Sequence, residues 1–333
     1  MFFKTPNVMT GLSLITKILE ESDQFDYVET RNGGAWRFQT PLMFQFTKPR
    51  QRVLISKERN ANPFFHAVEI LWMLSGSNRL EPLQFFIKNF GDYSDNGITL
   101  NGAYGERWRY NFFHDQLAWA EKHLRENPSS RRCVIGMFDP DMDHVDSKDI
   151  PCNTHLKFDI TKDKRDTSFL NLYLSNRSND IVWGMLGANY VHFTALQEYM
   201  ANRLGIQMGT FTVVSFDAHV YQSTRNPKLV GTVDWYKQNA WTMIPIDLHD
   251  SDLEACYECF KTDFSLNKLV GSNGFKSRWM RGVFKPMMLA YMNYQEKQYD
   301  LALKWAGEIA ATDWSQACED WINIRLEKKN GTK

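Results

Sequence analysis

A lone cysteine in a polar stretch is the first residue of this chain that could do chemistry. Cys152 follows Pro151 and directly precedes a predicted strand, within the polar residues 148–154. The next predicted strand ends at Arg177 and Ser178, and an arginine beside a hydroxyl is suited to binding phosphate. A thiolate near fixed positive charge is a nucleophile at neutral pH. The pattern favours covalent attack on a phosphorylated small molecule over the commoner role of a buried, inert cysteine.

Other cationic and polar side chains could complete an anion site. Arg131 and Arg132 directly precede a predicted strand; such a pair is usually solvated, but it could also bind a phosphate from outside the local fold. Arg31 lies next to two glycines, whose flexible backbone suits a contact with an anion. His219 and Tyr221 alternate along a predicted strand, so their side chains share one face. This spacing fits a pair that holds a sugar hydroxyl and a structural pair equally well.

Two further motifs contain residues that often carry chemistry. Glu69 lies inside the apolar helical run Phe64–Leu74, where an isolated carboxylate is costly, so we expect it to be paired or functional. Cys256 and Cys259 have the spacing of half a zinc site, but no second pair of cysteines or histidines accompanies them. We interpret these two cysteines as structural and expect no metal.

The composition of the 333 residues excludes several classes of protein. The 39 basic and 39 acidic side chains balance, which argues against proteins that coat DNA or membrane surfaces. No run approaches the ~20 apolar residues of a membrane-spanning helix, and the first residues lack the pattern of a signal peptide. Five cysteines do not make a disulfide framework. We expect a soluble protein of a reducing compartment, whose aromatic residues mostly pack in a core.

The elements that must position these residues alternate along the chain. Strand patterns occupy residues 133–138, 155–160, 169–174 and 210–216. Helical patterns occupy residues 64–74, 113–127 and 191–204, and the last fifty residues also look helical. Patterning is weaker between 228 and 268. Because no repeat or linker divides the chain, we predict a single α+β domain over residues 1–333, least defined after about residue 230.

Taken in order, the motifs resemble those of thymidylate synthase and its relatives, the phage-type pyrimidine nucleotide hydroxymethylases. The match runs from about Arg31 to Tyr221, a little over half of the chain, and keeps the order of the family motifs. Its parts are Arg31, Glu69-Ile70-Leu71-Trp72-Met73-Leu74-Ser75-Gly76, Tyr104-Gly105-Glu106-Arg107-Trp108-Arg109, Ser130-Arg131-Arg132, Pro151-Cys152, Arg177-Ser178-Asn179-Asp180 with Gly184, and Asp217-Ala218-His219-Val220-Tyr221.

The resemblance implies a fold and a reaction. The fold would be a three-layer α+β fold, with a large mixed β-sheet that packs against helices and forms the interface of a homodimer. The reaction would transfer a one-carbon unit from 5,10-methylenetetrahydrofolate to C5 of a pyrimidine deoxynucleotide monophosphate. No membrane or nucleic acid is required, and the place of action would be the cytoplasm, that of the host if the protein is a phage's.

The resemblance also implies a role for each site residue. Cys152 would add to C6 of the pyrimidine and make C5 nucleophilic. The other catalytic residues would be Glu69, which organises water for proton transfers, Tyr104 near the thiolate, and Asp180. The substrate-binding residues would be Arg31, Arg177, Ser178, and Arg131 and Arg132 of the partner subunit at the phosphate, Asn189 at the base, and His219 and Tyr221 at the sugar. The folate site would include Phe90, Tyr93, Asp180 and Gly184.

Departures from the family pattern bear on the product. Synthases usually have histidine after the catalytic cysteine, where this chain has Asn153, and tryptophans at the folate wall, where it has Phe90 and Tyr93. Synthases also end in a short apolar tail, whereas this chain ends in a polar one. A synthase must exclude water so that hydride reduces the transferred carbon, whereas a hydroxymethylase must admit water there. The altered wall and tail favour hydroxymethyl transfer over methyl transfer.

The residue that reads the base indicates uracil. In the family an asparagine for uracil, or an aspartate for cytosine, follows the glycine that aligns with Gly184 by four residues. That position is Ala188 here, and Asn189 comes one residue later, as if one residue were inserted. An asparagine offers a uracil edge both a donor and an acceptor. The sequence therefore favours dUMP over dCMP.

Alternative functions remain open at this point. The nearest is thymidylate synthase itself, or a related methyltransferase that converts dUMP to dTMP or dCMP to 5-methyl-dCMP. A cysteine hydrolase would pair Cys152 with His155 or His219, but it lacks an oxyanion motif and leaves the arginines unexplained. A catalytically inactive nucleotide-binding scaffold would not need Cys152, Glu69 and Arg177 together.

Overall fold

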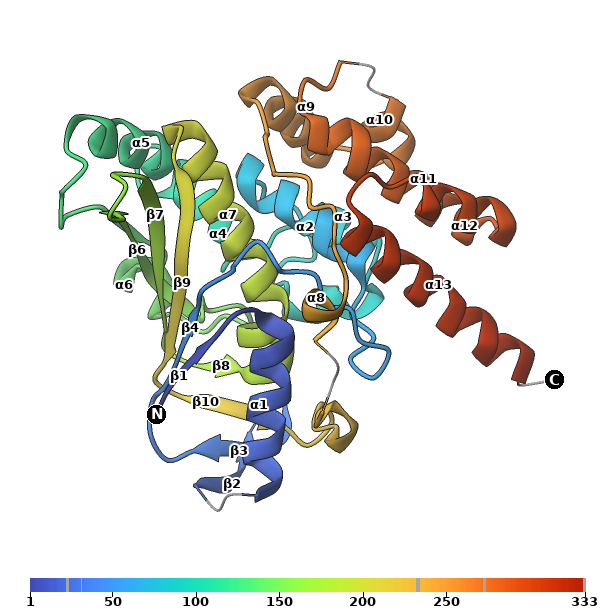
Figure 1. Ribbon diagram of the computed structural model, residues 1–333, viewed down its shortest axis with the longest axis horizontal. Helices are drawn as coiled ribbons and strands as arrows, with labels where there is room; N and C mark the ends of the chain where they lie inside the picture. Colours follow the sequence, from blue (N-terminus) through green and yellow to red (C-terminus); the bar gives the residue numbers. More distant parts are fainter. Residues whose placement is uncertain (22–23, 31, 232–233, 272–273, 332–333) are drawn as a thin grey trace.

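The computed structural model describes residues 1–21, 24–30, 32–231, 234–271 and 274–331, and its largest element is a six-stranded mixed sheet. Its strands lie side by side in the order β1-β4-β9-β7-β6-β5 (Figure 1). The bounds are β1 Phe2–Thr5, β4 Leu42–Phe46, β9 Gln207–Ser215, β7 Ser168–Asn176, β6 Asn153–Lys162 and β5 Val134–Gly136. Because β7 pairs parallel to β9 but antiparallel to β6, the mixed sheet of the predicted α+β class is confirmed.

A smaller sheet of four strands gathers segments from distant parts of the chain. Its order is β2-β3-β10-β8, with bounds β2 Phe25–Thr30, β3 Gly33–Phe38, β10 Ala218–Tyr221 and β8 Asn179–Asp180. The parallel pairing of β10 with β8 sets His219 opposite Asp180. The antiparallel pairing of β10 with β3 sets Tyr221 opposite Ala35. The motif that contains Asp180 and the motif that contains His219 and Tyr221 therefore meet in this sheet.

The helices form layers beside the large sheet. Helix α7 (Asn189–Leu204) packs between that sheet and α2 (Pro63–Ser75), and the C-terminal helices pack on the far side of α2 (Figure 1). The remaining helices are α1 Val8–Glu21, α3 Glu81–Gln84, η1 Lys88–Tyr93, α4 Tyr104–Glu106, η2 Arg107–Asn111, α5 Gln116–Glu126, α6 Pro140–Asp143, η3 Ile181–Ala188, η4 Pro227–Leu229, α8 Trp235–Gln238, α9 Asp250–Lys261, α10 Leu266–Gly271, η5 Met280–Phe284, α11 Lys285–Gln295, α12 Tyr299–Gly307 and α13 Thr312–Gly331.

Local sequence explains where α2 begins and ends. Asn62 caps its first turn, because the side chain accepts from the backbone N–H groups of Phe64 and Phe65. Pro63 occupies the first helical position, where a missing N–H costs nothing. Gly76 follows the last turn with φ of 85°, the left-handed conformation that glycine adopts most easily. The helix predicted at 64–74 is confirmed, and Glu69 is held on a rigid, buried element.

The other predicted elements are found, with boundaries that differ from the predicted ones by one to three residues. The four predicted strands correspond to β5, β6, β7 and β9, and the helix predicted at 191–204 corresponds to α7. The helix predicted at 113–127 instead begins at Gln116, because Asp115 accepts from the N–H of Ala118 and caps it there. Phe113 has φ of 64°, which excludes it from a right-handed helix.

The C-terminal part of the chain is helical, as expected. Helices α11, α12 and α13 cover most of the last fifty residues, and the weakly patterned segment 228–268 contains η4, α8, α9 and the start of α10. Within the described segments, no helix combines the length and the apolar character that crossing a bilayer requires.

Candidate active site

Cys152 is held at the entrance to β6 by a tyrosine. The backbone N–H groups of Cys152 and Asn153 each donate to Oη of Tyr104, at 3.2 Å in both cases. Tyr104 begins the short helix α4, and burial followed by the neighbouring Cys152 raises the pKa of its hydroxyl. The hydroxyl therefore stays protonated and fixes the loop from which the half-buried cysteine projects.

Arg177 lies against the loop that carries the cysteine. Its Nε and Nη2 donate to the carbonyls of Pro151 and Ile150, both at 2.9 Å. Its backbone N–H donates to the carbonyl of Cys152, also at 2.9 Å. The side chain is exposed, so the guanidinium can meet an anion from solvent while it braces the loop. The predicted proximity of the cysteine and the arginine is present in the structure.

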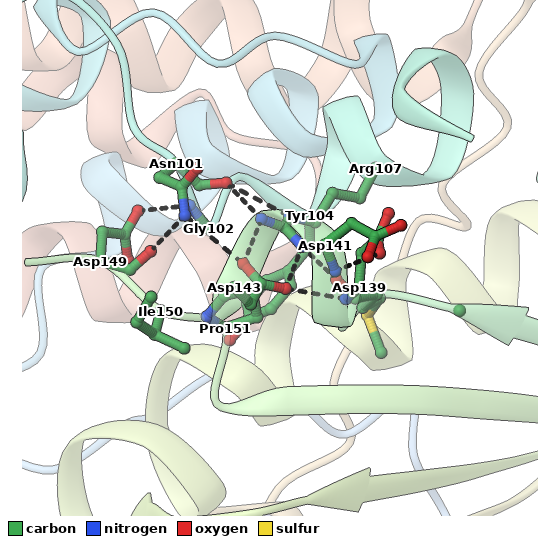
Figure 2. Close-up of polar contacts among 12 residues, drawn as sticks. Asn101, Gly102, Tyr104, Arg107, Asp139, Asp141, Asp143, Asp149, Ile150 and Pro151 are labelled. Carbon is green, nitrogen blue, oxygen red and sulfur yellow. Dashed lines mark hydrogen bonds and ion pairs between the residues drawn. The ribbon is translucent and has the colours of Figure 1, made fainter. Parts of the chain in front are cut away.

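A buried ion pair supports the loop before α4, which in turn contacts the segment before Cys152 through Asn101 and Asp149. Arg107 and Asp143 are both fully buried, and two parallel hydrogen bonds of 2.6 and 2.7 Å join them (Figure 2). Asp149 accepts from the N–H of Gly102 at 2.7 Å, which ties the residues just before Cys152 to the loop before α4 (Figure 2). These contacts hold the segment that leads to Cys152 against the loop before α4.

Asp180 lies beside the His219–Tyr221 pair in the small sheet, where β8 pairs with β10. Oδ1 of Asp180 accepts from the N–H of Trp183 at 2.6 Å and caps η3, while Oδ2 faces the N–H of Tyr221 at 3.4 Å. Burial raises the pKa of Asp180 against these hydrogen bonds. The rings of His219 and Tyr221 lie edge to face with centroids 4.9 Å apart. The predicted shared face of the two side chains is confirmed.

The hairpin between β2 and β3 contacts Tyr221. Oη of Tyr221 accepts from Nδ2 of Asn32 at 3.2 Å. The neighbouring Arg31, predicted to bind phosphate, lies outside the described residues.

A cavity of about 110 Å³ contains several of the predicted residues. It is lined by Glu69, Trp72, Met73, Leu83, Phe90, Leu100, Gly102, Ala103, Tyr104, Asp149, Asn189 and His192. A larger cavity of about 350 Å³ lies between α5, α7 and α9, and none of the predicted site residues lines it. We assign the site to the smaller cavity, because it brings together Glu69, Tyr104 and Asn189, the predicted reader of the base.

Glu69 has a histidine neighbour inside this cavity. Nε2 of His192 lies 3.2 Å from Oε2 of Glu69, yet neither atom completes a hydrogen bond within the described part of the chain. Burial raises the pKa of Glu69 to about 8 and lowers that of His192 well below its usual value. Behind them the pKa of His66 is lowered to about 3, by burial and then by Arg59. At neutral pH both histidines are therefore neutral, and Glu69 is mostly protonated.

Other predicted residues lie at the edge of the cavity or away from it. Tyr93 is 46% exposed and contacts Phe90, with ring centroids 5.7 Å apart. Arg131 and Arg132 are exposed before β5, whose first residue, Val134, pairs with Lys157 of β6. Because the pairing is antiparallel, the two arginines continue away from Cys152 and lie more than roughly 20 Å from it along the strand, at about 3.3 Å per residue. These two arginines therefore do not reach the cysteine of their own subunit. Ser178 is half-buried directly after Arg177.

Some residues of the site were missed in the sequence. His192 lies on α7, most of which is buried, and a lone histidine on such a helix looks like part of the core. Arg107 lies within a recognised motif, but only the structure shows that its partner is Asp143. Asn176 and Asn179 flank the arginine and serine; their side chains meet only because β7 and β8 bring them together. The only hint in the sequence is that asparagines recur in the site motifs, at positions 153, 176 and 179.

Comparisons with known proteins agree with this geometry. A sequence profile described as Thymidylate synthase matches residues 11–266. A protein of Pseudomonas phage M6 named deoxyuridylate hydroxymethyltransferase is 37% identical over 89% of this chain and 87% of its own length. One of the same name from Bacillus phage SP01 is 34% identical over 66% of this chain, and the match spans only 58% of that relative. The crystal structure of thymidylate synthase from T4 phage has a TM-score of 0.52 at 18% identity, over 64% of this chain and 76% of that one.

Proposed function

Because the chain belongs to the thymidylate synthase family, we propose that it is a one-carbon transferase that hydroxymethylates C5 of dUMP. The observation that carries the proposal is the Cys152 loop, which Tyr104 and Arg177 hold beside a cavity that contains Glu69 and Asn189. The extensive similarity to phage proteins named for the same reaction supports hydroxymethyl transfer as the outcome.

The proposed reaction begins with the cysteine. The thiolate of Cys152 forms a bond to C6 of the uracil ring, and the electron pair of the C5–C6 double bond moves to C5 and O4. The guanidinium of Arg177, fixed on the carbonyls of Ile150 and Pro151, binds the phosphate at the same time. A protonated Glu69 stabilises the charge that develops on the ring, because its raised pKa keeps a proton available in the cavity.

The residues around the cavity mouth suit a folate. The half-buried ring of Phe90 packs on Phe65 and Tyr93, with centroids 5.7 Å from each, which leaves an aromatic wall for a flat heterocycle. When bound there, 5,10-methylenetetrahydrofolate supplies a carbon at the oxidation level of formaldehyde. Phe90 and Asp180 would hold it, while Cys152 keeps the nucleotide in place.

The last steps require water and a proton acceptor. Once C5 has bonded to the one-carbon unit, C5 would lose its proton as the bond between that carbon and the folate nitrogen breaks, which leaves an exocyclic methylene group on the pyrimidine. A water oxygen would then bond to this carbon and lose one proton, while the C5–C6 double bond re-forms and the thiolate of Cys152 leaves C6. The net products are 5-hydroxymethyl-dUMP and tetrahydrofolate. Glu69 and the neutral His192 present unpaired polar atoms in the cavity, within the described structure, that suit a water at this place.

The local fold supports Asn189 as the reader of the base. The preceding segment, η3, has wide helical turns and a kink at Leu186 and Gly187, where the backbone leaves helical φ/ψ values. Such a wide turn holds one residue more than an α-helical turn. The kink thereby accommodates the extra residue and brings Asn189 into the cavity wall, whereas Ala188 is not among the residues that line it. At about 110 Å³ the cavity is smaller than the ~300–1,000 Å³ of pockets that enclose a whole ligand, so it suits the base alone.

We also propose a homodimer that shares its sites. Arg131 and Arg132 are exposed, and within the described segments neither guanidinium group makes a hydrogen bond or an ion pair, although the backbone N–H of Arg132 donates to Oγ of Ser130. Their distance from Cys152 of the same chain suits a role in the partner's site. A reaction between free nucleotides and folate is expected in the cytoplasm, as the sequence predicts.

One assay tests the reaction. The protein is incubated with dUMP and 5,10-methylenetetrahydrofolate, and the nucleotide product is identified by mass. We expect 5-hydroxymethyl-dUMP, with tetrahydrofolate as the second product and no reaction by the Cys152→Ser variant. Formation of dTMP together with dihydrofolate would instead identify a thymidylate synthase, the second candidate.

A further inference from the structure

Four asparagine side chains form a continuous hydrogen-bonded relay from the cysteine to the reader of the base. Nδ2 of Asn189 donates to Oδ1 of Asn179 at 3.4 Å, and Nδ2 of Asn179 donates to Oδ1 of Asn176 at 3.0 Å. Nδ2 of Asn176 in turn donates to Oδ1 of Asn153, the residue directly after Cys152. Every donor in the relay therefore points toward Asn153.

The relay is buried and has little room to rearrange. Asn153 and Asn176 are 0% exposed and Asn179 is 4% exposed. A Cβ atom at Gly184 would lie 2.0 Å from Oδ1 of Asn179 and 3.3 Å from Nδ2 of Asn189, so glycine leaves the space in which these two amides meet. Nδ2 of Asn153 has no hydrogen-bond partner in the described part of the chain, so the relay ends there on an acceptor.

A carboxamide reads uracil and cytosine equally well if it can turn over. Uracil presents a donor at N3 and an acceptor at O4, whereas cytosine presents an acceptor at N3 and a donor at the amino group. An asparagine has both a donor and an acceptor, so a rotation of its amide by a half-turn exchanges one reading for the other. An asparagine therefore discriminates between the bases only if something fixes which way its amide faces.

We propose that the relay fixes the amide of Asn189 and thereby sets the preference for uracil over cytosine. This inference rests on the proposed function, which names dUMP as the substrate. A turned amide would place Oδ1 of Asn189 against Oδ1 of Asn179, two acceptors with no proton between them, in a site where unpaired polar atoms are costly. Reversal without this clash needs all four amides to turn together. Asn153, Asn176 and Asn179 are in this sense positioning residues.

The direction of the donors yields a matched pair of variants. Asn179→Asp keeps one oxygen that accepts from Asn189 and places a second oxygen opposite Asn176. The amide of Asn176 can turn to donate to this second oxygen, because the amide of Asn153 can also turn, so that its unpaired Nδ2 donates to Asn176. Asn179→Leu has nearly the same shape but no acceptor. The experiment compares kcat/KM for dUMP and dCMP, and the affinity of each nucleotide without folate, in these variants and the unaltered protein.

We expect Asn179→Leu to lower the dUMP-to-dCMP ratio of kcat/KM by about tenfold or more, the scale of one base-reading contact. We expect Asn179→Asp to keep the ratio within about threefold of the original. Gly184→Ala is a second test, because its methyl group displaces Asn179 without a left-handed φ at that position, and it should lower the ratio in the same direction. Thermal unfolding establishes which variants fold, and Gly184→Ala decides if Asn179→Leu does not.

The outcomes separate the two proposals. Equal losses for both nucleotides in Asn179→Leu and Gly184→Ala, with the ratio unchanged, would overturn the relay and leave a purely structural role. If the unaltered protein binds neither nucleotide or forms no hydroxymethylated product, the proposed function fails instead. Since affinities are measured without folate, a change of base preference remains visible whatever the product is.

Discussion

Nε2 of His192 lies 3.2 Å from Oε2 of Glu69 in the wall of the cavity that Tyr104 and Asn189 also line. Both groups are neutral at pH 7, because burial raises the pKa of the carboxyl to about 8 and lowers the pKa of the imidazole. The contact is therefore between an acid that keeps its proton and a neutral imidazole, which has one ring nitrogen free to accept a proton. Such a pair can pass a proton to or from a water without a net charge in the cavity.

Activity should fall as the pH rises through about 8. Above that value Glu69 loses the proton that stabilises charge on the ring, since its pKa is raised to about 8. The measurement is the pH profile of kcat/KM for dUMP from about pH 6 to about pH 9.5, a range that extends to both sides of the pKa of Glu69. Glu69→Gln should have low activity and no fall in this range, because its amide does not titrate. An unchanged alkaline fall in Glu69→Gln would assign it to a group other than Glu69.

The same group makes stability depend on pH. In the unfolded chain Glu69 titrates near its ordinary value of 4.5, whereas in the folded protein it titrates at about 8. Between these values the folded state binds more protons, so the free energy of unfolding decreases as the pH rises from about 4.5 to 8. Urea unfolding at several pH values should show a shallower decrease in Glu69→Gln. An identical decrease in both proteins would contradict the assigned pKa.

Arg177→Ala should loosen the cysteine and weaken nucleotide binding together. The variant loses the two hydrogen bonds to the carbonyls of Pro151 and Ile150, and with them the positive charge beside the loop that carries Cys152. We expect a higher KM for dUMP and slower alkylation of Cys152, because less thiolate is present. Arg165→Ala, at an exposed turn between β6 and β7, is the matched control and should change neither quantity. A rise in KM with unchanged alkylation would limit Arg177 to the phosphate.

Removal of one partner of the buried Arg107–Asp143 pair should destabilise the protein strongly. Arg107→Met leaves a carboxylate buried without its cation, which typically costs about 3–5 kcal/mol of unfolding free energy. The measurement is equilibrium urea unfolding, and Lys162→Met, which removes an exposed pair with Asp166, should change it little. Adding Asp143→Leu to Arg107→Met should recover part of the loss, and no recovery would mean that packing rather than charge is responsible.

Mixed dimers should test whether the sites are shared. Arg131→Ala and Cys152→Ser should each be nearly inactive alone, while a mixture that exchanges subunits should regain about a quarter of the original activity, the share of sites with both groups intact. Exchange is verified by mass spectrometry of differently tagged subunits. Exchange without recovered activity would show that each chain supplies its own arginines.

Local sequence predicted the parts of the fold and site that depend on neighbours in the chain. Asn62 and Gly76 bound α2, and Cys152 and Arg177 stand in short, ordered motifs. The start of the helix at Gln116 was wrong by three residues, because the strength of Asp115 as a cap is not visible in the apolar pattern.

Tertiary contacts account for what the sequence did not reveal. His192 meets Glu69 because α7 packs on α2, and the asparagine relay forms because β6, β7 and β8 bring distant amides together. Nothing in their local spacing indicates these contacts. Gly184 was predicted at the folate; its role as a contact for the cofactor stays a prediction, while the structure shows what it leaves room for.

Arg177 braces Ile150 and Pro151, so in the proposed reaction one side chain would bind the phosphate and also support the loop that carries the nucleophile. A nucleoside without its phosphate would leave that cation uncompensated while the same cation still supports the attacking sulfur. Binding of the phosphate, which does not react, would therefore be coupled to the position of Cys152. A substitution of Arg177 would therefore change phosphate binding and the position of the nucleophile at the same time.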